Sequence, residues 1–348
     1  MGIMKYMRVI ASLIIISTVA LNFSGCDSNR RKDKKDIKLG FLVDALWEER
    51  WKRDMDLFTE NAKAYGAHVY TKSASGQGDL QIKMAMEMIK EGLDVLVVVP
   101  SSSKSAKSIV DLAHKKNVKV IAYDRMIRDC MLDYYVSFDS RKVGEIQAEY
   151  LVKKYPKGNY VLVGGSEEDD NAKLLWEGQH KVLDPYIKRG DIKVVLEEWT
   201  DDWNPIVAYD NVNFALKENR NDITAVLASN DGCARTVFQA LSEHKLAGKV
   251  GLTGQDADIA ACQRIVEGTQ SMTVYKPIRK LASKAAEIAV MLAKGKEAPT
   301  NTKLNNGFCD VPSFLIDPAC VDKSNIDEVV IEDGWQRKSE VYLNATDY

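Results

Sequence analysis

The sequence is poor in the residues and patterns on which many enzyme active sites and metal centres depend. Its four histidines, His68, His114, His180 and His244, are scattered, and none stands beside a cysteine or aspartate at metal-ligand spacing. It has no Gly-x-Ser-x-Gly motif of the serine hydrolases. Carboxylates are present, but in the polar motifs described below they alternate with arginine, asparagine and lysine. We therefore expect a protein that is not an enzyme and that needs neither a metal ion nor a cofactor.

Charge of one sign is also lacking, because 48 Lys and Arg nearly balance 50 Asp and Glu. The basic run at 30–35 is too short to form a nucleic-acid-binding face, so we expect no nucleic-acid partner. Cysteine is sparse and shows no CxxC spacing, which argues against a structural zinc site. Buried thiols are the favoured interpretation, although Cys309 and Cys320 could pair if their strands are adjacent.

Long hydrophobic runs are missing after the first residues, so no later stretch predicts a transmembrane helix. Near the start, a basic segment precedes the apolar run 9–20, and Ser24-Gly25-Cys26 follows, which is the pattern of a secretory signal. This stretch resembles a bacterial lipoprotein signal. The resemblance implies a signal peptide at 1–25, lipidation of Cys26, a polar tether at 26–35 and an extracytoplasmic protein anchored to the cell membrane.

The sequence does contain a repeated alternation of apolar strands and amphipathic helices. The strand at 37–43 precedes a helix at 47–65, and a helix at 105–116 precedes the apolar strand at 118–123. The alternation begins again near residue 140 and continues to a helix at 279–293. Each half is therefore predicted to form a doubly wound parallel sheet, which gives an α/β fold of two lobes.

The C-terminal tail is predicted to be strand-like and irregular. Residues 304–307 have the composition of a turn, and residues 311–316 and 329–331 are rich in β-branched side chains. The tail shows no helical pattern of its own, so we expect it to fold back on the two lobes.

Polar side chains recur immediately after the predicted strands. Asp124 and Arg125 directly follow the strand at 118–123, and an unpaired buried charge there would be too costly for a core position. From this pair alone, a ligand contact and a surface ion pair stay equally open. The same position after other strands is occupied by Asp44, Asp139, Ser166, Asn230, Asp256 and Lys276. Since ligands of open α/β sheets bind outside the carboxyl ends of the strands, the recurrence predicts one polar pocket.

The chemistry of this set favours a neutral sugar. Carboxylates, amides and guanidinium groups can pair with hydroxyls, which donate and accept hydrogen bonds, and indole rings can cover the apolar faces of a pyranose. Trp51 lies at the start of the first helix and Trp203 lies in a polar loop. Trp51 could instead belong to the core, and Glu167 and Glu168 are interpreted as a solvated helix start.

Several motifs resemble those of bacterial D-xylose-binding proteins, which are type I periplasmic binding proteins. They include Ala122-Tyr123-Asp124-Arg125-Met126, Asp169-Asp170-Asn171-Ala172-Lys173, Ala228-Ser229-Asn230-Asp231 and Gly254-Gln255-Asp256-Ala257-Asp258. The similarity extends over about residues 36–340. It implies two lobes, 36–140 plus 277–316 and 141–276 plus 317–348, joined by a three-stranded hinge.

The same resemblance implies the site residues, the ligand and the partners. The expected hydrogen-bonding ligands of the sugar are Arg50, Asp124, Arg125, Asn171, Asn230, Asp256 and Lys276. Trp51 and Trp203 are the expected stacking walls, and Asp169 is a nearby polar member. D-xylose or a similar pentose is the expected ligand, and a membrane ABC-type permease is the expected partner. The alternatives are a subunit that signals xylose to a membrane sensor histidine kinase, a receptor for a furanose signal and a sugar-processing enzyme.

Overall fold

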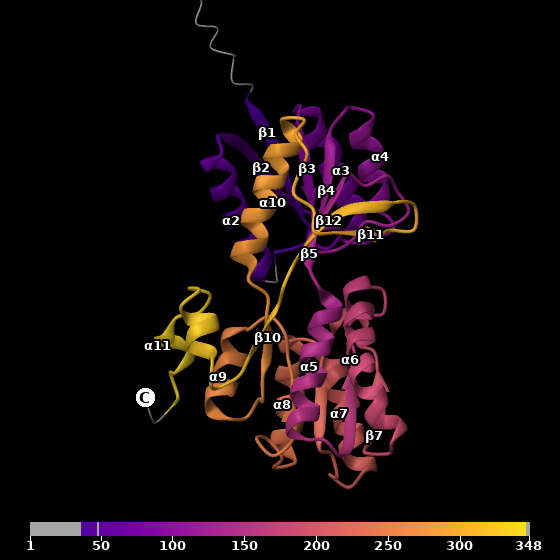
Figure 1. Cartoon of the computed structure of the whole chain (residues 1–348), viewed down its shortest axis with the longest axis vertical. Coiled ribbons are helices and arrows are strands. Elements are labelled where there is room, and N and C mark those ends of the chain that lie inside the picture. The colour runs from indigo at the N-terminus through magenta and orange to yellow at the C-terminus, as the bar shows by residue number, and fades with distance from the viewer. Residues whose placement is uncertain (1–35, 47–48, 346–348) are drawn as a thin grey trace, which may run out of the picture. The chain divides into compact units, whose positions relative to one another are not determined.

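The computed structural model describes residues 36–46 and 49–345 (Figure 1). The predicted signal peptide 1–25, the tether 26–35 and Cys26 lie outside the described residues. Within the described ranges, no helix is both long and apolar enough to cross a membrane.

The first sheet contains seven strands in the order β11-β12-β5-β4-β3-β1-β2 (Figure 1). The strands are parallel except for β11, which runs antiparallel to β12 at the edge. Their bounds are β1 Ile37–Val43, β2 Ala67–Ser73, β3 Val95–Val98, β4 Lys119–Tyr123, β5 Tyr134–Phe138, β11 Thr302–Asn305 and β12 Asp310–Ile316.

Helices cover both faces of this sheet because successive side chains of its strands point to opposite sides. Phe41 packs with helices α2 (Glu49–Ala64) and α10 (Ile278–Ala293), whereas its neighbour Leu42 packs on the other face. That second face is covered by α3 (Gly78–Lys90) and α4 (Lys107–His114). Burial on both faces explains why the central strands are almost entirely apolar.

The second sheet contains four parallel strands in the order β7-β6-β8-β9. Their bounds are β6 Gly158–Val163, β7 Ile192–Glu198, β8 Ala225–Ala228 and β9 Gly251–Leu252. One face packs on α7 and α8, and the other packs on α5 and α6. The helices are α5 Ser140–Lys154, α6 Asp170–Lys188, α7 Pro205–Glu218, α8 Asp231–Glu243 and α9 Ile259–Glu267.

The chain passes between these two halves three times within the described residues. The connections run from β5 to α5, from β10 (Thr273–Tyr275) to α10, and from β12 to β13 (Ala319–Val321), and β10 pairs antiparallel with β13 (Figure 1). The predicted fold class of two α/β lobes with parallel sheets is confirmed. The residue limits of the lobes, 36–140 plus 277–316 and 141–276 plus 317–348, stay our proposal.

The prediction for the tail is wrong in two places. Asp327–Ile331 (η2) is helical rather than extended, and a short helix α11 follows at Lys338–Val341. Val330 is fully buried against α9 and β10, so packing overrides the preference of β-branched residues for strands. Leu304 and Asn305, expected in a turn, lie in β11 instead.

All five cysteines among the described residues are free thiols. The Sγ of Cys309 lies 3.7 Å from the carbonyl oxygen of Cys130, whereas Cys320 lies in β13 opposite Val274. Cys309 and Cys320 are therefore not paired in this structure.

Candidate functional site

Asp124 is held in place by the turn that ends β4. Its backbone has φ 65°, a conformation that Asp tolerates better than most residues. Its N–H donates to the carbonyl of Val136 at 2.8 Å. Its carbonyl accepts from the hydroxyls of Tyr135 at 2.8 Å and Ser137 at 2.7 Å. The carboxylate is thus fixed at the carboxyl end of the sheet, where the strand pattern placed it.

Arg50 reaches this carboxylate from the first turn of α2. Its Nη2 donates to Asp124 Oδ2, and its Nε donates to Asp54 Oδ2 at 3.1 Å. The guanidinium lies 4.4 Å from the centroid of the Trp51 ring and 5.7 Å from that of Phe138. A planar cation between two carboxylates and an indole face is well oriented for directional hydrogen bonding.

Arg125 joins the two halves of the chain. Its Nη1 donates to Asp44 Oδ2 at 3.0 Å, and its Nε lies 3.8 Å from Asp169 Oδ2. Asp169 caps the N-terminus of α6 and also accepts from the indole N–H of Trp203 at 3.2 Å. The partners of Arg125 therefore include Asp44 and Asp169, whereas Asp124 accepts from Arg50.

Asn171 and Arg128 add two more contacts between the end of β4 and the start of α6. Asn171 Nδ2 donates to the carbonyl oxygen of Asp124 at 3.0 Å, and Asn171 Oδ1 accepts from Ser140 Oγ at 3.1 Å. Arg128 Nε donates to Asp170 Oδ2 at 2.7 Å. Polar groups of the first and second sheets therefore meet at the same place.

Asp256 and Lys276 form an ion pair, with Lys276 Nζ 2.8 Å from Asp256 Oδ1. The ammonium lies 5.9 Å from the Phe138 ring, which also faces Arg50, so this pair borders the Arg50–Asp124 contact. Asn230 is placed differently. It caps α8 by accepting from the N–H of Cys233 at 2.8 Å, and among the described residues no hydrogen bond connects it with the other predicted ligands.

The two tryptophans differ in burial. Trp51 is 2% exposed and packs in the hydrophobic core, while the guanidinium of Arg125 lies 5.5 Å from its ring centroid. Its buried Nε1 has no hydrogen-bond partner among the described residues. Trp203 is half-buried, and its ring lies so close to Gly165 that a Cβ there would come within 2.3 Å of it. Trp51 is therefore a core residue that faces the charged cluster, and Trp203 lines it.

Burial and ion pairing determine the charges in this cluster. Burial disfavours the charge of Asp124, but Arg50, Lys276 and Arg125 outweigh it and hold its pKa below the usual value. Burial raises the pKa of Asp54 to about 6, although Arg50 opposes this. Asp124 is thus ionised at neutral pH, whereas Asp54 titrates close to the physiological range.

Comparison with known proteins assigns the chain to a family. The model of the periplasmic binding protein domain matches residues 39–297. The chain belongs to the periplasmic binding protein family. It is 50% identical over 308 residues to a D-xylose-binding periplasmic protein of Haemophilus influenzae, which covers 88% of this chain and 93% of the relative. It is 49% identical over 307 residues to the Escherichia coli protein of the same description, with 88% and 93% covered.

The solved structures agree with this assignment. A carbohydrate transporter solute binding protein from Chloroflexus aurantiacus, in complex with D-glucose, superposes with a TM-score of 0.83 and is 30% identical. The match covers 88% of this chain and 98% of that structure. A solute binding protein from Clostridium phytofermentans with bound β-D-glucose gives a TM-score of 0.80 at 30% identity, covering 87% of this chain and 99% of that structure.

In this periplasmic binding protein, two residues join the cluster that the sequence analysis did not place in the pocket. Asp54 pairs with Arg50, and Phe138 faces both Arg50 and Lys276. Asp44, which its place directly after a strand did indicate, pairs with Arg125. Asp54 lies four residues after Arg50 on the same helical face, and this spacing could also have indicated it. Phe138 had no signal beyond its position at the end of β5.

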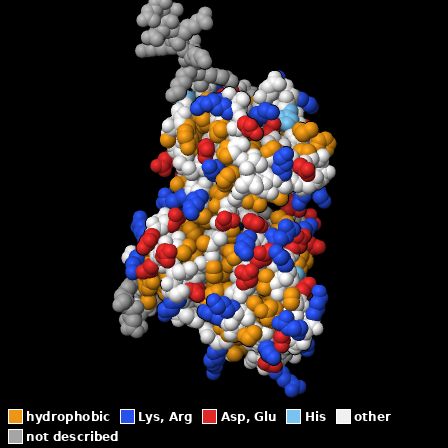
Figure 2. Space-filling view, viewed as in Figure 1, with side chains coloured by type: hydrophobic (Ala, Val, Ile, Leu, Met, Phe, Trp, Pro, Cys, Tyr) orange, Lys and Arg blue, Asp and Glu red, His pale blue; other side chains and the backbone are white. Residues whose placement is uncertain are grey.

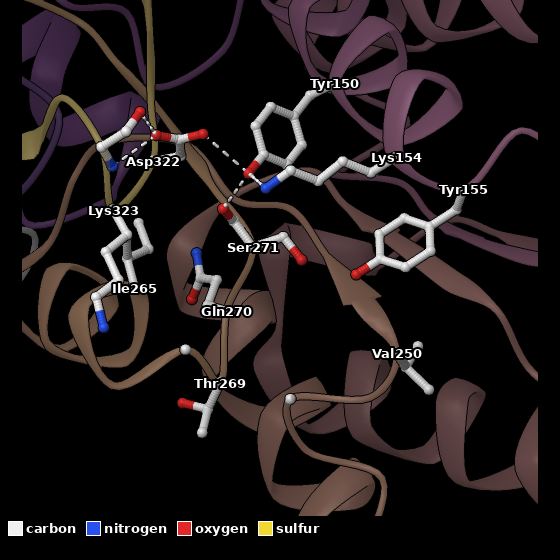
Figure 3. Close-up of a pocket in the computed structure, with 13 residues that line it drawn as sticks. Tyr150, Lys154, Tyr155, Val250, Ile265, Thr269, Gln270, Ser271, Asp322 and Lys323 are labelled. Atoms are coloured by element: carbon white, nitrogen blue, oxygen red, sulfur yellow. Dashed lines mark hydrogen bonds between the residues drawn. The ribbon is translucent and has the colours of Figure 1, made fainter.

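The cavity drawn in Figure 3 lies elsewhere in the protein. It has a volume of about 310 Å³ and is lined by residues including Tyr150, Lys154, Ser271 and Asp322 (Figure 3). The Tyr150 hydroxyl lies within hydrogen-bond distance of two acceptors, the carbonyl oxygen of Ser271 at 2.9 Å and Asp322 Oδ2 at 3.1 Å. None of the predicted sugar ligands lines this cavity, so it is a different place from the charged cluster.

Two features outside the cluster, possible metal ligands and surface charge, can be described for the residues that the structure covers. Over the described part of the chain, no group of three or more His, Cys, Asp or Glu side chains is arranged to hold a metal ion. On the face shown in Figure 2, basic and acidic side chains are intermixed rather than gathered into a patch of one sign.

Proposed function

We propose that the chain is an extracytoplasmic receptor that binds D-xylose or a similar pentose at the charged cluster and presents it to a membrane ABC-type permease. The observation that carries the proposal is the meeting of Arg50, Asp124, Arg125, Asp169 and Asn171 from both halves of the chain. The two relatives described as D-xylose-binding proteins, which are about half identical to this chain, support the choice of sugar.

The members of the charged cluster pair with one another in this structure. A neutral sugar suits such a cluster because its hydroxyls can take part in the same hydrogen bonds. A sugar hydroxyl both donates and accepts, so it can replace a carboxylate as the partner of Arg125 and can donate to Asp124 beside Arg50. Such an exchange leaves each buried group satisfied, which avoids the cost of an unpaired one. We propose that Asn230, Asp256 and Lys276 complete the hydrogen bonds and that the Trp51 and Trp203 rings cover the apolar faces of the sugar.

The small size of the ligand requires a large binding free energy per atom. A pentose has about ten non-hydrogen atoms, so micromolar binding at roughly −8 kcal/mol requires about −0.8 kcal/mol per atom. This efficiency requires that nearly every hydroxyl be paired and that water be excluded. Contacts from both halves of the chain support such an enclosure, since ligand closure by two lobes is a common way to achieve it.

The membrane attachment and the partner belong to the same proposal. We propose that Cys26 carries the lipid anchor after removal of residues 1–25, with 26–35 as the tether. Delivery to a permease is supported by the description of the Chloroflexus aurantiacus relative as a carbohydrate transporter solute binding protein. We prefer this role to signalling through a sensor kinase on that basis.

Calorimetric titration of the protein with D-xylose, L-arabinose, D-ribose and D-glucose tests the proposal. We expect D-xylose to bind with a dissociation constant in the micromolar range or tighter, and more tightly than the hexose. A parallel thermal-shift series should show a rise in melting temperature with D-xylose, because a ligand that binds the folded state stabilises it. Absence of any pentose binding would overturn the proposed ligand class.

A further inference from the structure

A fully buried carboxyl group lies behind Arg50 and is not among the predicted ligands. Asp54 is 0% exposed and lies one helical turn after Arg50 on α2. Its Oδ2 accepts from Arg50 Nε at 3.1 Å, and its Oδ1 accepts from the Tyr123 hydroxyl. Both oxygens are thus occupied by donors from within the protein, so Asp54 has no direct role in ligand contact.

We propose that Asp54 is a positioning residue that fixes the Arg50 guanidinium in its sugar-binding orientation, with Tyr123 holding Asp54 in turn. This inference rests on the proposed sugar-binding function. Asp54 engages Nε of Arg50 and Asp124 engages Nη2, while Nη1 has no hydrogen-bond partner among the described residues. The arrangement fixes the plane of the guanidinium and keeps N–H groups available for a ligand.

The supporting residues are themselves rigidly packed. The Tyr123 ring packs edge-on against Phe41 at 5.1 Å between centroids, and Phe41 contacts Phe58 of α2 at 4.8 Å. Asp124 follows Tyr123 directly in the chain. Arg50 and Asp54 of α2 therefore form hydrogen bonds with two consecutive residues at the end of β4, Asp124 and Tyr123. Holding a flexible arginine in place before the ligand arrives reduces the entropy lost on binding.

The titration of Asp54 provides a readout that distinguishes positioning from packing. The charged and titratable groups that face it are Arg50 from its own helix and Tyr123 and Asp124 from the end of β4. Burial raises the pKa of Asp54 to about 6, against the opposing effect of Arg50. Among the described residues no histidine is hydrogen-bonded to this group, and the side-chain hydrogen bonds of His114, His180 and His244 are made with residues outside the cluster.

Asp231 also titrates abnormally, because burial and the nearby Asp258 and Asp256 raise its pKa. The wild-type pH profile alone therefore does not assign the titration to Asp54. Substitution of Asp54 makes the assignment, because it removes the titration of Asp54 and leaves that of Asp231.

The experiment measures the D-xylose dissociation constant of the wild type and of Asp54→Asn by calorimetry between pH 5 and pH 8. The amide has the shape of the carboxylate but cannot accept from both Arg50 and Tyr123. We expect Asp54→Asn to bind roughly fivefold to tenfold more weakly at pH 8, with little dependence on pH. Wild-type affinity should fall below pH 6 towards that of the variant, so the two curves converge.

Two further variants make the result decisive. Tyr123→Phe removes a donor that lowers the pKa of Asp54, so the affinity loss should begin at a higher pH than in the wild type. Asp56→Asn, on the exposed side of the same helix and paired with Lys52, is the matched control and should follow the wild-type profile.

The failures of the two proposals are distinguishable. If the wild type binds no sugar, the proposed function fails, and the positioning role fails with it. If the wild type binds D-xylose and the Asp54→Asn curve runs parallel to the wild-type curve or coincides with it, Asp54 has only a structural role and the inference alone is overturned.

Discussion

At the scale of single residues, the site depends on cations held between carboxylates from different parts of the chain. Arg125 contacts Asp44 after β1 and Asp169 at the start of α6, and Arg50 contacts Asp54 and Asp124. Removal of one cation leaves more than one acceptor without its partner, which costs more than the loss of a single surface contact.

Arg125→Ala is expected to abolish most sugar binding. The substitution removes the planar donor and leaves Asp44, whose Oδ1 already lacks a hydrogen-bond partner among the described residues, without Arg125 at Oδ2 as well. We expect affinity for D-xylose to fall by about 100-fold, as for the loss of charge-assisted hydrogen bonds. Calorimetry measures the change, with Arg141→Ala, from an exposed ion pair with Glu177, as the control. Equal affinity of Arg125→Ala and the wild type would exclude Arg125 from the site.

Asp54 is also expected to make the folded protein less stable as pH rises. Because its folded-state pKa of about 6 lies above the ordinary value of 3.8, its contribution is fully present below about pH 4 and is lost as pH rises through about 6. The contribution is at most about 3 kcal/mol. Urea unfolding at pH 4.5 and pH 7.5 should show a smaller pH dependence for Asp54→Asn than for the wild type. An identical pH dependence would contradict the assigned titration.

At the scale of elements, two helices of the second half are packed to backbone contact. A Cβ on Gly144 of α5 would lie 1.9 Å from the carbonyl oxygen of Leu175, and a Cβ on Gly178 of α6 would lie 2.0 Å from that of Arg141. The close approach places the start of α6, with Asp169 and Asn171, in a fixed position relative to α5.

Gly178→Ala is therefore expected to destabilise the fold. The added methyl group meets backbone rather than a flexible side chain, so α5 and α6 must move apart. We expect a loss of about 2–3 kcal/mol in the free energy of unfolding, as for overpacked cores. Urea denaturation measures it, with Gly78→Ala as the control, where the nearest atom to an added Cβ is 3.5 Å away. Similar stability of the two variants would refute the close packing of these helices.

The elements with clear periodicity were predictable from the sequence. Strand β1 has the predicted bounds, and α10 differs by one residue at its start, because an uninterrupted apolar run and helical spacing identify them. The tail was not predictable in the same way. Val329, Val330 and Ile331 favour strands locally, but the burial of Val330 against α9 decides the helical conformation.

The candidate site was predictable to a similar degree. Positions just after strands indicated Asp124, Arg125 and Asp256, because the topology of parallel sheets brings strand ends together. The pairing was not predictable, since whether Arg125 reaches Asp124 or Asp44 depends on side-chain directions in three dimensions. Asp54 was missed because it lies inside a helix, where a carboxylate is ordinarily solvent-exposed.

At the scale of the whole molecule, the two halves of the described chain meet through polar side chains. Arg128 with Asp170, Arg125 with Asp169, and Asn171 with Asp124 all connect the end of β4 with the start of α6. Such contacts break and form more readily than a hydrophobic interface, which suits a receptor that must admit and release its ligand.

Arg128→Ala is expected to weaken sugar binding only slightly. The ion pair with Asp170 is partly exposed, with side-chain accessibilities of 32% and 21%, so its contribution is at most about 1 kcal/mol and is screened by salt. We expect a loss of affinity of up to about fivefold in 20 mM salt, which shrinks in 500 mM salt. Calorimetry at both salt concentrations measures it. A loss that is equal at both concentrations would show that Arg128 acts through something other than this ion pair.

The most direct test of the central claim is a crystal structure of the protein with D-xylose. We predict one sugar between the end of β4 and the start of α6, hydrogen-bonded to Arg125 and Asn171 and in contact with the Trp203 ring. A sugar bound in the 310 Å³ cavity beside Tyr150, or in contact with only one of the two halves, would contradict the account.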